Sequence, residues 1–134
     1  MADAVLACAV MDRLSAMGIG IAIDDFGTGF SSLSHLRQLP VDLIKVDKSF
    51  VLNMDRSEDD AVIVRSTIAL GHSLGLEVVA EGVETEESLR RLRALECDFA
   101  QGYHVCRPLP AGEIARWLVS SPWSQAAVDV PAPA

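Results

Sequence analysis

The sequence is poor in aromatic residues and in positive charge. Aromatic side chains make up 5% of the 134 residues, and 11 lysines and arginines stand against 19 acidic residues, giving a net charge of −8. Such an acidic surface is unsuited to nucleic acids and to anionic membranes. We therefore expect no DNA or RNA partner. A phosphorylated ligand would need a metal ion between itself and this protein.

The cysteine pattern gives no sign of a disulfide framework or a cysteine metal site. The cysteines, Cys8, Cys97 and Cys106, are odd in number and include no Cys-x-x-Cys pair, and the histidines show no ligand spacing with them. Reduced thiols in a cytoplasmic protein are the simplest interpretation. The most apolar later run, 61–70, contains Arg65 and is too short to span a bilayer, so we expect no membrane segment.

Half of the residues are apolar, and their spacing predicts helices that alternate with strands. Leu6, Val10, Leu14 and Met17 recur at helical spacing, and Gly18 follows as a helix-ending glycine. Strands are expected over 19–24, 41–47 and 76–81 and within 97–105. Helices are expected over 31–38, from Ser57 to Gly75, from Thr85 onward and after Pro110, with a connecting turn over 49–54. The long helix is expected to bury Ile63, Thr67, Leu70 and Leu74.

Strands alternating with helices favour an α/β fold with a parallel sheet and right-handed crossovers. A closed (β/α)₈ barrel needs about 250 residues, so this chain is expected to form a partial TIM-type barrel of about four βα units after a first helix. Residues 1–120 are assigned to this domain and 121–134 to a flexible tail. The two open sheet edges and the uncovered sheet face would need a partner, self-association or refolding into an open sheet.

Polar side chains lie at or near the carboxyl end of each expected strand. They are Asp24 and Asp25, Lys45, Glu81, and Gln101. Carboxylates bind hard divalent cations, a lysine polarises water or phosphate, and an amide orients a ligand, so together they resemble a metal-centred site. Alternatively, the two aspartates could cap the next helix, and Lys45 could be an edge lysine whose amine reaches solvent.

Four motifs, in order and in spacing, resemble the EAL family of cyclic-di-GMP phosphodiesterases. They are Asp24-Asp25-Phe26-Gly27-Thr28-Gly29, Leu39-Pro40-Val41-Asp42-Leu43-Ile44-Lys45-Val46-Asp47, Val79-Ala80-Glu81-Gly82-Val83-Glu84-Thr85, and Gln101-Gly102-Tyr103 with Arg107-Pro108-Leu109-Pro110. The match covers the chain from about Leu6 to Leu118.

The resemblance implies a (β/α)₈ barrel that hydrolyses cyclic di-GMP to linear pGpG with two Mg²⁺ or Mn²⁺ ions. Asp24 would bridge the ions and Asp25 would bind the second. Lys45 would position the attacking water, Glu81 would be a metal-associated acid or general base, and Gln101 would hold the site water. Residues 26–32 would order the acids and contribute to dimer contacts. Glu84, Arg107 and Pro108 would lie near this loop and the guanine-binding rim.

The sequence departs from the family in lacking the Glu-Ala-Leu signature, which the family carries in its first four strands with an Asn and a further metal-binding Glu. The chain thus corresponds to strands five to eight, and we expect little or no hydrolysis by this polypeptide alone. It would act with a complementing N-terminal half or as a homodimer. The alternative is a non-catalytic EAL-like module that binds or dimerises in cyclic-di-GMP signalling.

Overall fold

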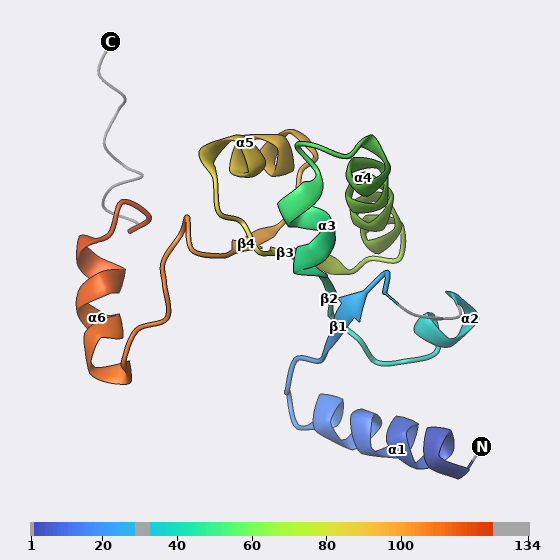
Figure 1. The fold of residues 1–134 in the computed structure, drawn as a ribbon. Coiled ribbons are helices and arrows are strands. Elements are labelled where there is room, and N and C mark those ends of the chain that lie inside the picture. The colour runs from blue at the N-terminus through green and yellow to red at the C-terminus, as the bar shows by residue number, and fades with distance from the viewer. Residues whose placement is uncertain (1, 29–32, 125–134) are drawn as a thin grey trace.

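Helices alternate with parallel strands in the computed structural model, which describes residues 2–28 and 33–124 (Figure 1). In chain order the elements are α1 (Ala2–Ala16), β1 (Ala22–Phe26), α2 (Leu33–Leu36), β2 (Leu43–Val46), α3 (Lys48–Asn53), α4 (Glu58–Ser73), β3 (Glu77–Glu81), α5 (Glu86–Ala94), β4 (Phe99–Gln101) and α6 (Ala111–Ser120). The strands form one sheet in the order β1-β2-β3-β4, and every pair is parallel. This arrangement confirms the predicted α/β class and the predicted sheet.

One face of the sheet carries the core. Helices α3, α4 and α5 lie together on this face (Figure 1), and the residues that β2 and β3 turn toward them, Ile44, Val46, Val78 and Ala80, are fully buried. The alternate residues, among them Leu43, Lys45, Val79 and Phe99, point to the opposite face and remain partly or largely exposed. Parallel sheets normally have both faces covered, so this second face is the unusual feature of the fold.

The connecting turn predicted over 49–54 is wrong, because the segment forms α3. Asp47 caps this helix, its carboxylate accepting a hydrogen bond from the Ser49 amide at 2.9 Å. Val51 and Met54 are then buried in the core. A six-residue helix that is stabilised by its N-cap and by burial of Val51 and of the C-cap residue Met54 leaves little periodicity in the sequence.

The buried face of α4 is also rotated relative to the prediction. Thr67 is buried as expected, but Ile63, Leu70 and Leu74 are only partly buried, and the core residues are Ala61, Val64, Ile68 and Gly71. A Cβ on Gly71 would lie 2.6 Å from Val78 Cγ2. The helix therefore lies close to the sheet at Gly71, where a side chain would not fit.

Ser57 and Thr85, the residues at which two helices were expected to begin, are the N-caps of α4 and α5. The Ser57 hydroxyl accepts from the Asp60 amide at 3.3 Å, and the Thr85 hydroxyl accepts from the Ser88 amide at 3.1 Å. Leu89 and Leu92 of α5 are buried, and Leu95 at its C-cap is partly buried.

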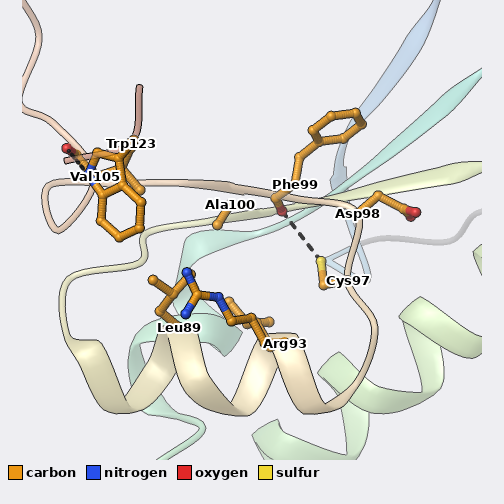
Figure 2. A pocket seen from close by; sticks show the side chains of 9 residues that line it. Leu89, Arg93, Cys97, Asp98, Phe99, Ala100, Val105 and Trp123 are labelled. Atoms are coloured by element: carbon orange, nitrogen blue, oxygen red, sulfur yellow. Dashed lines mark hydrogen bonds between the residues drawn. The ribbon is translucent and has the colours of Figure 1, made fainter. Parts of the chain in front are cut away.

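Packing extends beyond the domain end predicted at residue 120. Trp123 packs against the core, and its indole Nε1 donates to the Val105 carbonyl at 3.0 Å (Figure 2). The rest of the predicted tail, 125–134, lies outside the described residues. Within the described part of the chain, no helix has the length and apolarity needed to cross a membrane.

Candidate active site

The two adjacent aspartates lie within β1, which begins and ends later than predicted. The register between β1 and β2 shifts between Ile23 and Phe26, forming a bulge. At this bulge Asp25 adopts a left-handed conformation with φ of +51°, which aspartate tolerates better than most residues. The carboxylates of Asp24 and Asp25 can therefore approach the same ligand, although alternate strand residues would normally point apart. Among the helices whose N-caps the structure describes, α3 to α6, neither aspartate is the cap.

Glu81 completes a group of three carboxylates. It ends β3, and its register partner on β4 is Gln101. One carboxylate oxygen from each of Asp24, Asp25 and Glu81 can be chosen so that all lie within 4.8 Å of one another. Oxygen ligands on opposite sides of a bound Mg²⁺ or Ca²⁺ are about 4–5 Å apart. The donor chemistry and the spacing thus fit a hard divalent cation.

Lys45 lies beside this group on the less covered face of the sheet. Its Nζ is 2.6 Å from Glu81 Oε1 and 3.6 Å from Asp24 Oδ1. Hydrogen bonding to Glu81 raises the pKa of the Lys45 ammonium, against a smaller opposing effect of burial. The lysine therefore stays charged at neutral pH. The alternative of an edge lysine is wrong, because β2 lies between β1 and β3.

Negative charge dominates the surroundings of these residues. A cavity of about 440 Å³ at the carboxyl ends of the strands is lined by Asp24, Asp25, Asp47, Lys48, Leu52, Glu81, Gly82, Glu84, Gln101, Gly102 and Tyr103. A hydrogen bond to Asp47 and the charge of Asp24 raise the pKa of Asp25. Hydrogen bonds from Ser49 lower the pKa of Asp47 instead. Because the acids repel one another, a bound cation would relieve that repulsion.

The structure brings most of the predicted site residues together. Asp24, Asp25, Glu81, Glu84 and Gln101 line the cavity, and Lys45 pairs with two of its acids.

Arg107 and Pro108 lie outside the cavity lining and are exposed. Arg107 is nevertheless adjacent to the site, because its guanidinium carbon is 4.8 Å from the ring centroid of Tyr103, which does line the cavity. Within the predicted loop 26–32, residues 29–32 lie outside the described residues.

The sequence prediction missed Asp47, Lys48 and Tyr103 as cavity residues. Asp47 could have been found, because strand alternation places it on the same face as Lys45. The signals for Lys48 and Tyr103 were weaker. Lys48 begins a helix that was predicted as a turn, and Tyr103 follows a glycine at the end of the shortest strand.

Comparison with known families gives a direct match to these motifs. The profile of the EAL domain family matches residues 1–108. The chain belongs to the EAL domain family. This result confirms the resemblance predicted from the four motifs, and the matched range includes every predicted site residue.

Two curated relatives of this EAL chain show how far the similarity extends. An uncharacterised signalling protein of Caulobacter vibrioides is 53% identical over 108 residues, covering 81% of this chain. The bifunctional diguanylate cyclase/cyclic di-GMP phosphodiesterase MucR of Pseudomonas aeruginosa is 46% identical over 114 residues, covering 85% of this chain. The chain spans only 13% and 17% of the lengths of these two relatives.

Solved EAL structures share the fold of this chain. It superimposes on the MucR phosphodiesterase in complex with c-di-GMP with a TM-score of 0.80 and 46% identity, covering 85% of this chain and 46% of that one. For the EAL domain of Mycobacterium smegmatis DcpA the TM-score is 0.81 and the identity 42%, covering 87% and 52% respectively. The chain thus corresponds to about half of an EAL domain.

Proposed function

We propose that this chain supplies the C-terminal half of the active site of a cyclic-di-GMP-specific phosphodiesterase, which hydrolyses cyclic di-GMP to pGpG. The observation that carries the proposal is the convergence of Asp24, Asp25, Glu81 and Lys45 at one edge of the sheet in an EAL family member. Relatives named as cyclic-di-GMP phosphodiesterases, and a solved relative in complex with c-di-GMP, support the choice of substrate.

Mg²⁺ or Mn²⁺ is the proposed cofactor, two ions in an intact domain. Asp24 would bridge the ions, Asp25 would bind the second, and Glu81 would contribute a further carboxylate. Bound divalent ions supply neutralising charge for the phosphate and lower the pKa of water. The cavity needs this positive charge, because its lining holds five acids and one lysine, with Lys45 adjacent. Without bound cations, these acids would repel the anionic substrate.

The charge states assign different roles to Lys45 and Glu81. A protonated Lys45 cannot accept a proton, so it acts as a donor that orients the attacking water or the phosphate oxygen. Glu81, 2.6 Å from that ammonium, would be a metal-associated acid or the general base that accepts the proton of the water. Gln101 at the adjacent strand end would hold the water, and Glu84, Arg107 and Pro108 would support the guanine-binding rim.

This polypeptide alone is proposed to have little or no phosphodiesterase activity. Three carboxylates from one half of the site hold Mg²⁺ loosely, since this ion prefers near-octahedral oxygen coordination. A complementing N-terminal half or a second copy would be needed to close the site. A non-catalytic EAL-like binding module remains the second candidate, favoured by the exposed apolar residues of α1 and by the absence of Glu-Ala-Leu from the sequence. The proposed cytoplasmic location is supported by unpaired cysteines.

Mn²⁺ binding tests whether the three carboxylates of Asp24, Asp25 and Glu81 hold a cation. Two glutamates of β3 serve as the test residue and its control. Glu81 and Glu77 lie on the same face of β3, at the carboxyl and amino ends respectively. We expect Glu81→Gln and Asp24→Asn each to weaken Mn²⁺ binding at least about tenfold, because each removes one of three carboxylate ligands. Glu77→Gln should leave it unchanged. The readout is the loss of the free Mn²⁺ paramagnetic resonance signal on titration with protein. Equal effects at Glu81 and Glu77 would contradict the proposal.

A further inference from the structure

Lys45 lies between the strands that carry the acids of the site. Its strand, β2, is flanked by β1, which carries Asp24, and by β3, which carries Glu81 (Figure 1). The register partner of Lys45 on β3 is Val79, two residues before Glu81, so the side chains of Lys45 and Glu81 share one face of the sheet. The lysine side chain therefore extends toward the carboxyl ends of the strands, where its ammonium reaches two acids.

The contacts of this ammonium are with oxygens that a metal ion would also need. Nζ is 2.6 Å from Glu81 Oε1 and 3.6 Å from Asp24 Oδ1, and both residues belong to the group of three carboxylates that could hold a cation. The Lys45 and Glu81 side chains are 24% and 18% exposed, so water screens their attraction less than that of a surface ion pair. A divalent cation coordinated by the same carboxylates would be repelled by the ammonium beside them.

The pairing with these acids is specific to Lys45. The other ion pairs in the part of the chain that the structure describes involve none of the three carboxylates. The chain contains only one further lysine, Lys48, which is exposed and lines the cavity from the start of α3. A lysine ammonium is charged at neutral pH, so Lys45 supplies the positive charge that the acids would otherwise take from a metal ion.

We propose that Lys45 is an internal counter-ion that competes with the divalent cation for Glu81 and Asp24. In the cation-free chain the ammonium pairs with these acids, and it gives up Glu81 when a cation binds. The inference rests on the proposed function, because it concerns the same carboxylates, and it deepens that function by making a side chain of the site the control on cation binding.

Mn²⁺ titration of the full 134-residue chain, followed by paramagnetic resonance, tests the competition. Lys45→Met should bind Mn²⁺ at least about tenfold more tightly than the unmodified chain, because the neighbouring positive charge is gone. Lys45→Arg keeps that charge and should bind no more tightly than the unmodified chain. Lys48→Met is the matched control and should change the affinity less than about threefold, because exposed charges interact weakly. Circular dichroism checks that each variant keeps the fold.

Several results of this titration would overturn the competition. Unchanged or weaker Mn²⁺ binding in Lys45→Met would show that the lysine does not oppose the ion. An equal gain in Lys48→Met would show that any nearby positive charge has the same effect. Absence of binding in Lys45→Met up to about 10 mM Mn²⁺ would also contradict the proposal.

Magnetic resonance of the lysine ammonium groups detects the release of Lys45 directly. Because the chain has two lysines, Lys45→Met and Lys48→Met assign both signals. Without a metal ion, the Lys45 ammonium hydrogens should exchange with water more slowly than those of Lys48, since they are held by Glu81. Saturation with Mg²⁺, which is diamagnetic, should raise the Lys45 exchange rate toward that of Lys48. Slow exchange that persists with Mg²⁺ bound would overturn the proposal.

Two combinations of results separate this inference from the proposed function. Mn²⁺ binding that is weakened in Asp24→Asn but not strengthened in Lys45→Met would overturn the competition and leave the half-site standing. Tighter binding in Lys45→Met, with no hydrolysis of cyclic di-GMP once the chain is joined to the N-terminal half of a relative, would uphold the competition and overturn the proposed phosphodiesterase.

Discussion

Replacing Gly102 with alanine is expected to lower the free energy of unfolding by about 3–4 kcal/mol or to prevent folding. A Cβ at this position would lie 2.1 Å from the Val83 carbonyl oxygen and 2.4 Å from the Val83 nitrogen. These are backbone atoms, so no rotamer change can relieve the overlap. Separating the two segments would break the bonds from the Val83 amide to the Gln101 carbonyl and from the His104 amide to the Val83 carbonyl, each 3.0 Å.

Gly112→Ala provides the control for the glycine substitution itself. Gly112 lies in α6, and a Cβ there would meet nothing within 4 Å. Because alanine favours a helix over glycine, we expect this variant to be neutral or up to about 1 kcal/mol more stable. Urea unfolding followed by circular dichroism measures both variants. Similar stabilities for the two would show that Gly102 and Val83, which follow β4 and β3, do not approach as closely as described.

Replacing Lys45 with methionine is expected to lower turnover at least about 10²-fold in a complete site. A complete site can be built by grafting residues 6–118 in place of the matching segment of the MucR EAL domain, which is 46% identical in structure-based comparison. Methionine keeps the length of the side chain but removes the charge that faces Glu81 and Asp24. The water or phosphate would lose its donor, and two acids would lose their counter-ion.

Lys48→Met in the same graft is the matched control. Lys48 lines the same cavity but is exposed and lies on α3, beyond the end of β2. Turnover should fall less than about tenfold, because exposed lysines interact weakly with their neighbours. Steady-state hydrolysis of cyclic di-GMP gives kcat for both variants. Equal losses at the two lysines would remove the special role proposed for Lys45.

Much of this fold could be predicted from the sequence, because the spacing of apolar residues and the residues that begin and end helices indicate the same elements. Helical spacing, capping residues such as Ser57 and Thr85, and buried alternation in β2 all point to the observed elements. The proximity of Lys45 and Glu81 also follows, since the carboxyl ends of parallel strands meet at one edge of the sheet.

The geometry of the site could not be predicted in the same way. The bulge that turns Asp24 and Asp25 toward one cation depends on a left-handed residue whose conformation is set by the pairing of β1 with β2. Helix α3 depends on burial of Val51, which only the packed sheet provides. Trp123 lies in the segment assigned to a flexible tail, and the partner that anchors it, the Val105 carbonyl, is remote in sequence and could not be named in advance.

Hydrolysis of cyclic di-GMP by the MucR graft in the presence of Mn²⁺ tests the central claim most directly. If residues 6–118 supply half of a phosphodiesterase site, the graft converts cyclic di-GMP to pGpG and its Asp24→Asn variant does not, while the 134-residue chain shows little or no turnover. A graft that is folded and binds Mn²⁺ but hydrolyses no substrate would contradict the claim. So would turnover that survives the Asp24→Asn substitution.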